Sequence, residues 1–183
     1  MSKADRTRAA LMRAALDLFQ ESGYDATTAA AVAERAGVTE MTFFRYFPSK
    51  DSVLLADPYD PLIAEAITRQ PAHLSPITAA IGGVVESWKA IPSPPSGEVR
   101  ERLRIVSRTP SLRGAIARNN AATEAAIAGA LAERGAERTD ARIAAAATMG
   151  ALSAALLDWA DGEDADLATA IDAARRVLLG DPR

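Results

Sequence analysis

Apolar residues recur every three or four positions along most of the chain, which is the spacing of amphipathic α-helices. The first such stripe covers residues 6–21, carries Leu11, Leu18 and Phe19, and ends at Gly23. Glycines and prolines separate the later stripes, so the pattern predicts an all-α protein of about nine to ten helices. The later helices are predicted at 27–36, 39–47, from 50 onward, and at 62–67, 76–88, 98–107, 112–133, 139–160 and 165–179.

Residues 27–50 contain two short helical patterns separated by Gly37, which is the plan of a helix-turn-helix. Thr27 and Thr39 are predicted to cap the two helices, because a threonine hydroxyl accepts a hydrogen bond from an unpaired backbone N–H. The glycine accepts the left-handed backbone conformation that a tight connection needs. The second helix is predicted to bury Phe43 and to leave a polar face exposed.

The pattern TT....A..AGV....F.RYFPSKD, with the preceding RTRAALMRAALDLFQESGYDATT, resembles the DNA-binding signature of TetR-family transcriptional regulators. The resemblance implies a three-helix helix-turn-helix domain over residues 1–56 and a C-terminal helical ligand-binding and dimerisation domain over 57–183, with Pro58 and Pro61 at the boundary. It also implies a cytoplasmic repressor that binds a palindromic DNA operator as a homodimer. A small hydrophobic or acyl-type effector is expected to release it.

The resemblance places the DNA contacts on the second and third helices, where side chains position the protein on phosphates or contact base edges. The side chains that correspond to phosphate contacts are Thr27, Thr28, Thr42, Tyr46 and Lys50, the last at the start of a fourth helix that links the two domains. Each also fits a structural role, such as a cap or half-buried packing. The side chains expected to face base edges are Thr39, Glu40, Met41 and Arg45.

Two positions depart from the commonest family pattern. Phe44 stands where many members carry a tyrosine, and Ala30 stands where a polar or acidic residue is frequent. Base contacts are therefore expected from the third helix more than from the second. Together with the acidic Glu40, which phosphates repel, these residues leave an alternative open: a helical interaction protein with a degenerate DNA-binding head.

Charge is distributed unevenly along the chain. The net charge is −3, but residues 1–50 hold seven basic and six acidic side chains, and the excess of acidic residues lies beyond residue 50. Lys3, Arg6, Arg8 and Arg13 precede the motif with one acidic residue among them, so the N-terminus is predicted to be an arm that meets phosphate. A solvated helix start is the other interpretation.

The helix predicted at 139–160 is unusually rich in alanine, glycine and serine. Small side chains let another helix approach closely, and such a surface is unlikely to face water. Packing inside the subunit accounts for one face, and a second subunit accounts for the opposite one, as in TetR-like proteins whose last two helices pair across a two-fold axis. The larger residues predicted at this interface are Met149, Leu152, Leu156, Trp159, Ile171 and Val177.

An effector is expected between the helices of the C-terminal domain, although the apolar candidates also fit plain core packing. The segment RERLRIVSRTPSLRGAIARN resembles a branch similar to the regulator of the mycofactocin system, which implies an acyl-coenzyme A or other lipid-like effector. The candidate contacts are Trp88, Leu103, Arg104, Arg108, Asn119, Asn120, Thr123 and Met149.

Other classes of protein lack support in the sequence. There is no cysteine and one histidine, His73, so no metal cluster or other cofactor is predicted. No nucleophile–base pair or phosphate-binding glycine loop is visible, so the chain is predicted not to be an enzyme. No uninterrupted apolar run approaches the roughly 20 residues of a membrane span. The late acidic residues are interpreted as caps and solvated charges: Asp158, Asp161, Glu163, Asp164 and Asp166.

Overall fold

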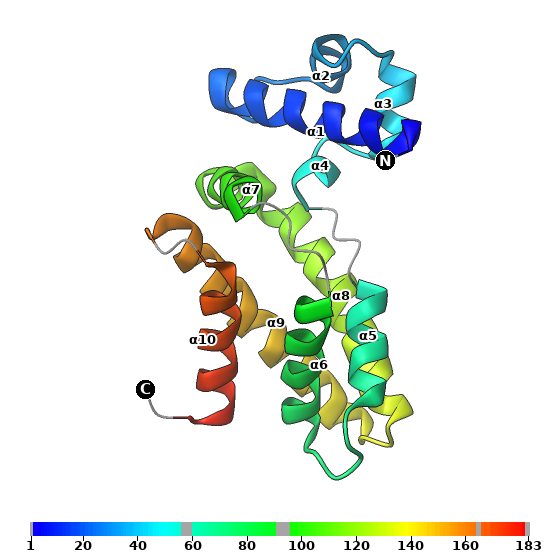
Figure 1. The fold of residues 1–183 in the computed structure, drawn as a ribbon, viewed down its shortest axis with the longest axis vertical. Helices are drawn as coiled ribbons and strands as arrows, with labels where there is room; N and C mark the ends of the chain where they lie inside the picture. The colour runs from blue at the N-terminus through cyan, green and yellow to red at the C-terminus, as the bar shows by residue number, and fades with distance from the viewer. Residues whose placement is uncertain (1, 56–59, 91–95, 164–165, 182–183) are drawn as a thin grey trace. The chain divides into compact units, whose positions relative to one another are not determined.

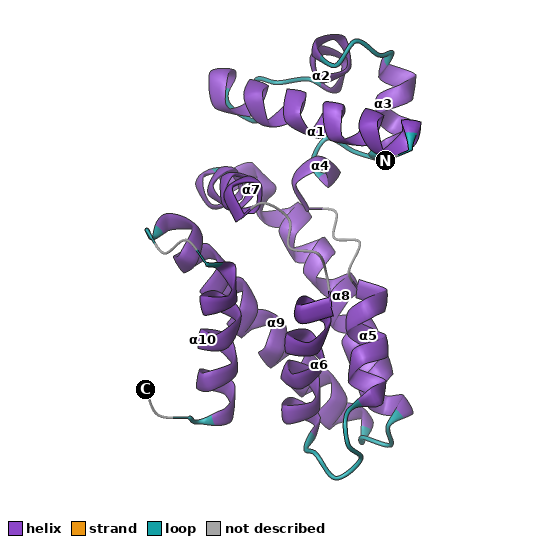
Figure 2. Ribbon diagram, viewed as in Figure 1, coloured by secondary structure: helices purple, strands orange, loops and turns teal. Residues whose placement is uncertain are grey.

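The computed structural model describes residues 2–55, 60–90, 96–163 and 166–181 (Figure 1). These ranges contain ten α-helices, one short 3-10 helix and no strand (Figure 2), which confirms the all-α prediction. The α-helices are α1 (Lys3–Ser22), α2 (Ala29–Arg35), α3 (Glu40–Tyr46), α4 (Ser52–Leu55), α5 (Asp60–Arg69), α6 (Pro76–Ala90), α7 (Ser96–Arg108), α8 (Arg113–Glu133), α9 (Arg138–Asp161) and α10 (Leu167–Leu179), and the 3-10 helix is η1 (Pro110–Leu112).

The chain divides into two compact units. Unit 1 consists of Met1–Ala56 together with Glu101–Ile116, and unit 2 consists of Asp57–Arg100 and Ala117–Arg183. The sequence pattern predicted a boundary between residues 56 and 57. The segment at 101–116 differs, because the sequence analysis assigned it to the C-terminal domain. The helices of the first 56 residues bury little apolar surface by themselves, and this later segment supplies more of it.

The core of unit 1 is built around aromatic side chains. Phe43 and Phe47 are fully buried and lie 5.7 Å apart between ring centroids. Val106 and Leu112, from the end of α7 and from η1, pack in the same cluster. Arg102 also belongs to this unit, and its Nε and Nη2 donate to the carbonyl of Leu54 at 3.1 and 2.6 Å. The turn that ends α4 is therefore held by a residue of α7.

Unit 2 is packed mainly through small side chains. α6 lies against α5, α9 and α10, and α9 pairs with α10 (Figure 1). A Cβ added at Gly83 of α6 would lie 2.8 Å from the backbone nitrogen of Ile67, so only glycine permits this approach of α6 to α5. Arg134 donates to the carbonyls of Ile67, Gln70 and Pro71, which satisfies the C-terminal end of α5.

α9 is long and apolar enough to cross a membrane by length and composition, a test that the core helix of a soluble protein also passes. In unit 2 it packs against α6 and α10. Ala141, Ala144 and Ala145 are buried in one apolar cluster, and Leu152 is buried in a second. α9 is thus buried on one face within this unit and exposed on another.

The basic residues predicted to form an N-terminal arm lie in helix α1, as in the alternative interpretation of a helix start. α1 begins at Lys3, because Ser2 caps it: the Ser2 hydroxyl accepts from the backbone N–H of Asp5 at 3.1 Å, and the Asp5 carboxylate accepts from Ser2 N–H at 2.7 Å. The sequence analysis missed this capping box. α4 also begins later than predicted, at Ser52 instead of Lys50. Pro58, which was expected to break the chain, lies outside the described residues.

Candidate nucleic-acid interface

The first helix of the motif is capped one residue later than predicted. The hydroxyl of Thr28 accepts from Ala31 N–H at 3.1 Å, so Thr28 is the N-cap of α2. Thr27 is buried, and its hydroxyl donates to the carbonyl of Gly23 at 2.9 Å. The predicted capping role of Thr27 is therefore wrong, and its hydroxyl faces the protein interior. Of the two threonines, Thr28 is the exposed one.

The turn between α2 and α3 has the geometry that the sequence predicted. Gly37 has φ +69°, and Val38 N–H donates to Ala33 carbonyl at 2.9 Å. Thr39 caps α3, because its hydroxyl accepts from Thr42 N–H at 3.2 Å. The hydroxyls of these two threonines lie 3.0 Å apart. The N-terminus of α3 is thus fixed by two polar side chains on its exposed side.

α3 separates an apolar inner face from an exposed outer one. Phe43 is fully buried, whereas Met41 is 83% exposed and Phe44 is 46% exposed. Glu40 and Arg45 are exposed as well. Met41 and Phe44 expose apolar area to water without filling the core. Apolar area that gathers on one exposed face is typical of a contact surface. Thr42 and Tyr46 are half-buried at the edge of this face.

Lys50 is more engaged than the sequence analysis predicted. Its ammonium donates to the carbonyls of Tyr24 and Thr27 at 2.7 and 2.8 Å, and it lies 4.0 Å from the centroid of the Tyr24 ring. Burial lowers the pKa of Lys50, and the carboxylates of Asp25 and Asp51 oppose that shift. Lys50 therefore fastens the loop between α1 and α2. It does not stand at a helix N-terminus, and that part of its predicted role is wrong.

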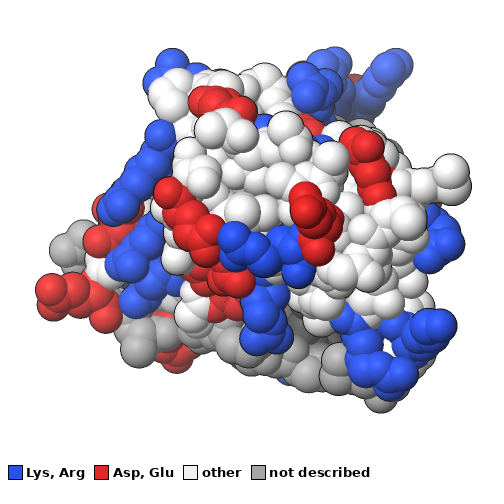
Figure 3. Space-filling model, turned by 90° about the horizontal axis from the view of Figure 1, so that it is seen from above, with Lys and Arg blue, Asp and Glu red and all other residues white. Residues whose placement is uncertain are grey.

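Arg8 is also held within unit 1. Its guanidinium lies 4.5 Å from the centroid of the Phe47 ring and donates to Tyr46 carbonyl at 3.2 Å. Arg35 pairs with Glu21 through two hydrogen bonds of 2.8 and 3.1 Å. Figure 3 shows the face of the molecule seen from above in Figure 1. Acidic side chains lie among the basic ones there, so the charge on this face is mixed in sign.

The predicted effector contacts divide between the two units. Trp88, Asn119, Asn120, Thr123 and Met149 lie in unit 2, where Asn120 Nδ2 donates to Ser153 Oγ at 3.3 Å. The remaining three belong to unit 1 instead of the second domain, and they are Leu103, Arg104 and Arg108. Periodicity placed them on a helix but gave no information about which unit that helix joins.

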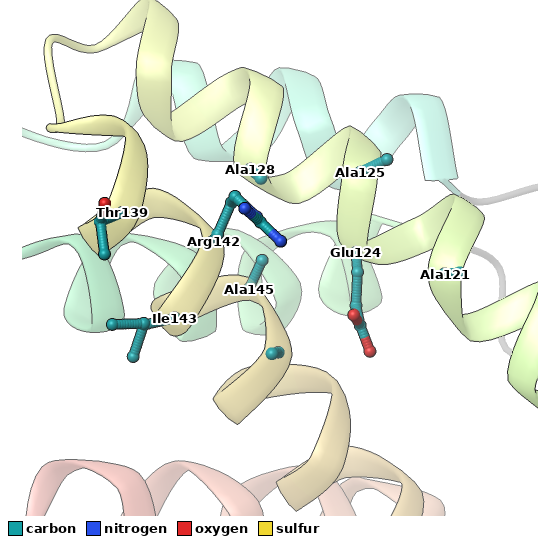
Figure 4. A pocket seen from close by; sticks show the side chains of 9 residues that line it. Ala121, Glu124, Ala125, Ala128, Thr139, Arg142, Ile143 and Ala145 are labelled. Atoms are coloured by element: carbon teal, nitrogen blue, oxygen red, sulfur yellow. The ribbon is translucent and has the colours of Figure 1, made fainter.

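A groove of about 470 Å³ lies between α8 and α9, and none of the predicted effector contacts lines it. Figure 4 shows Glu124 on α8 and Arg142 on α9 at its sides, with Ala128 and Ala145 between them. The walls are mostly alanine, so the groove results from small side chains on two neighbouring helices. Ile143, at its margin, is 62% exposed.

Three of the predicted interface residues are buried within the chain itself. Leu152, Trp159 and Ile171 form part of the core of unit 2, so they are not the exposed knobs that the sequence analysis expected. Met149 and Leu156 are half-buried, and Val177 is 77% exposed. The exposed apolar positions of α9 follow one helical face instead. They are Ile143, Ala146, Ala147, Gly150 and Ala154.

A polar cluster that the sequence analysis did not single out lies at Arg100 and Trp159. The Arg100 guanidinium carbon is 4.3 Å from the centroid of the Trp159 ring. Arg100 belongs to a run of arginines, and spacing alone gives no reason to separate it from the solvated ones. Among the described residues no group of three histidine, cysteine or acidic side chains is arranged to hold a metal ion. Asp166 caps α10 by accepting from Ala168 N–H at 2.9 Å.

Comparison with known families identifies both parts of the chain. Residues 11–56 match the family described as bacterial regulatory proteins, tetR family, and residues 74–181 match the MftR C-terminal domain. The HTH-type transcriptional regulator TcmR of Streptomyces glaucescens is 33% identical over 147 residues. That alignment covers 72% of this chain and 62% of TcmR, so the chain spans less than two thirds of this relative.

Solved structures share the fold. SmeT, the repressor of a multidrug efflux pump in Stenotrophomonas maltophilia, superposes with a TM-score of 0.59 at 20% identity over 94% of this chain and 88% of SmeT. NalD of Pseudomonas aeruginosa, the secondary repressor of another efflux pump, gives 0.57 at 22% identity over 98% and 95%. At these identities the likeness concerns the fold alone.

Proposed function

The chain belongs to the TetR family of bacterial regulatory proteins and carries an MftR-type C-terminal domain, and on this basis we propose that it is a repressor that binds a palindromic operator as a homodimer. The observation that carries the proposal is the exposed face of α3, with Met41 and Arg45 outside and Phe43 inside. A major groove admits one such helix. A non-enzymatic role agrees with the regulators to which the chain is similar.

In this proposal the side chains of α2 and α3 have two different tasks. Thr28, Thr42 and Tyr46 hold the phosphate backbone, and Met41 and Arg45 contact base edges. Arginine donates two hydrogen bonds to guanine, and methionine packs on a thymine methyl. Glu40 contributes least to affinity, because phosphates repel its carboxylate.

The test is selection of duplexes from a random DNA pool, followed by gel-shift titration on the selected sequence. Arg45→Ala is expected to weaken specific binding about 10- to 100-fold, with a smaller loss on unrelated DNA. Arg35→Ala is the matched control, because Arg35 is an exposed arginine of the last turn of α2 that pairs with Glu21. It should change specific binding no more than about threefold. Failure to enrich any sequence would favour the helical interaction protein instead.

The exposed small-residue face of α9 supports the homodimer. Ile143 and Gly150 lie on this face, and Val177 of α10 is exposed as well. Two such subunits would present their α3 helices to major grooves about 34 to 36 Å apart. Gly150→Glu should shift the mass measured by light scattering from two chains toward one. Ala10→Glu, which adds the same charge at an exposed position of α1, should leave the measured mass unchanged. A dimer that persists in Gly150→Glu argues against the exposed face of α9 as the interface.

A small acyl-type or hydrophobic effector completes the proposal. The MftR-type C-terminal domain and the polar residues inside unit 2 support it, among them Asn120 and the buried Thr123. An effector releases DNA only if it binds the DNA-free arrangement more tightly than the DNA-bound one. Arg102 on α7 holds the end of α4, so a shift of α7 offers a route to unit 1.

A further inference from the structure

Arg100 and Trp159 form a buried donor cluster in unit 2. Trp159 is 5% exposed, and the guanidinium of Arg100 lies over its ring. Four buried side-chain polar atoms have no hydrogen-bond partner among the described residues, and three of them belong to this pair. They are Nε and Nη2 of Arg100 and Nε1 of Trp159.

All three unpartnered atoms are donors, so the cluster lacks an acceptor. Stacking on an indole uses the flat face of a guanidinium and leaves its N–H groups free in the plane of the group. A buried donor without an acceptor is costly, and the cost is larger when the group is charged. The missing partner is therefore an oxygen acceptor, and a negatively charged one compensates the cation as well.

Nearby carboxylates do not fill this role in the described part of the chain. Asp158 and Asp161 flank Trp159 in sequence, and Glu98 precedes Arg100 on α7, but all three are exposed. None of them accepts a hydrogen bond from the buried atoms of Arg100. With no acceptor among the described residues, a molecule that binds to this unit can supply it.

The same side of α9 continues into an apolar cluster. Leu152 and Ala155 lie seven and four residues before Trp159, which places them on one helical face with it. Both pack in a cluster with Ile81 and Val84 of α6. The donor cluster is therefore bordered on this side by apolar side chains, which suit the aliphatic part of a ligand whose anionic group meets the donors.

We propose that Arg100 and Trp159 bind the carboxylate or phosphate group of an amphiphilic small molecule. The proposal rests on the proposed function only where it identifies this molecule with the effector. Arg100 and Arg102 are two residues apart on α7, and Arg102 holds the Leu54 carbonyl in unit 1. Binding at Arg100 therefore acts on the helix that also holds α4.

The test is isothermal titration calorimetry on the full chain with octanoate, octyl phosphate, octanol and inorganic phosphate. Octanoate or octyl phosphate should bind at least about tenfold more tightly than octanol, which has the same tail and no charge. The tighter of the two identifies the head group. Tight binding of inorganic phosphate alone would show that the tail contributes nothing, and equal binding of octanol would overturn the anion site.

Variants separate a ligand contact from a structural one. Arg100→Met should weaken binding of the preferred anion about 10- to 100-fold, whereas the ligand-free chain should melt at the same or a higher temperature, because an unpaired buried charge is removed. Trp159→Phe keeps a ring and deletes one donor, so a loss of about 2- to 20-fold is expected. Arg138→Met, on the exposed start of α9, is the control and should leave binding unchanged.

Two results would overturn the proposal: unchanged anion affinity in Arg100→Met, or an equal loss in Arg138→Met. A gel shift with and without the preferred anion then tests the regulatory role independently. Anion binding that leaves DNA affinity unchanged would keep the site and reject its identification with the effector. DNA release by octanol at the same concentration as by the anion would reject the site and keep an effector-responsive regulator.

Discussion

The two units differ in how completely their buried polar groups are paired. In unit 1 the Thr27 hydroxyl, the Lys50 ammonium and the Arg102 guanidinium all donate to backbone carbonyls. In unit 2 Arg134 does the same, but the side chains of Arg100, Thr148 and Trp159 keep buried atoms that have no partner among the described residues. The difference indicates that unit 1 is completed by its own chain and presents one fixed surface, whereas unit 2 has unused binding capacity.

The cores of the two units also differ in the size of the side chains that fill them. Unit 1 packs large aromatic rings that fit one arrangement, with Phe43 touching both Phe44 and Phe47. Unit 2 packs alanine-rich helices, among which α9 exposes small residues on one side. Helices with small side chains slide past one another at low cost, and shear of packed helices is a common form of ligand response. An aromatic-cored unit 1 joined to a small-residue unit 2 agrees with the ligand-controlled regulator proposed above.

The largest expected effect separates the two cores. Phe43→Ala should destabilise unit 1 by about 3–5 kcal/mol, because a fully buried ring leaves a cavity. Phe44→Ala, at the exposed neighbouring position, should cost about 1 kcal/mol or less. Hydrogen exchange resolved along the chain should show lost protection in α1 to α4 and retained protection in α6 and α9. Equal loss of protection in both units would mean that they unfold together, and the two cores would then not be independent.

A second substitution examines unit 2 in the same way. Gly83→Ala places a methyl against the Ile67 backbone and should destabilise this unit by about 1–3 kcal/mol. Gly129→Ala is the matched control, because nothing lies within 4 Å of that position in α8, and it should stabilise by about 0.4–1 kcal/mol. Denaturant titration followed by circular dichroism checks both. If Gly83→Ala is tolerated, α6 and α5 separate more easily than their close contact indicates.

The smallest expected effect concerns pH and unit 1. Burial, with Asp51 and Asp25 nearby, raises the pKa of Tyr24 to about 12. The unfolded chain loses this proton near pH 10, so the contribution to stability is fully present below that pH and is lost as the pH rises through about 12. Ultraviolet titration of phenolate formation should show one tyrosine ionising late, and Tyr24→Phe should remove that step. If all tyrosines instead ionise near pH 10, Tyr24 is exposed to water, and unit 1 is less tightly packed than the comparison with unit 2 assumes.

Local features of the helix-turn-helix were predictable because their causes are local. Gly37 at the turn, the cap at Thr39 and the buried Phe43 follow from steric and hydrogen-bonding rules that act over a few residues. The first cap was misplaced by one position, because Thr27 and Thr28 are chemically equivalent in sequence. Which of them turns inward depends on the path of the loop after α1, where the Thr27 hydroxyl meets the carbonyls of Gly23 and Leu18.

Long-range features were missed for the same physical reason. Helical periodicity identified α7, but it carries no information that the end of this helix packs with Phe43 and Phe47 of unit 1. It also gave no means to separate Arg100 from the other arginines of its run. That distinction depends on a tryptophan about 60 residues later, which periodicity assigned to an intersubunit surface.

The composition of unit 1 also constrains when this unit can finish folding during synthesis. Val106 and Leu112 belong to its core, yet they leave the ribosome long after α3. At about 5–20 residues per second, the roughly 60 residues that follow α4 up to Ile116 take about 3–12 s to be translated. During that interval helices α1 to α4 lack part of their core. Phenylalanines that are buried in the folded protein are then accessible to chaperones.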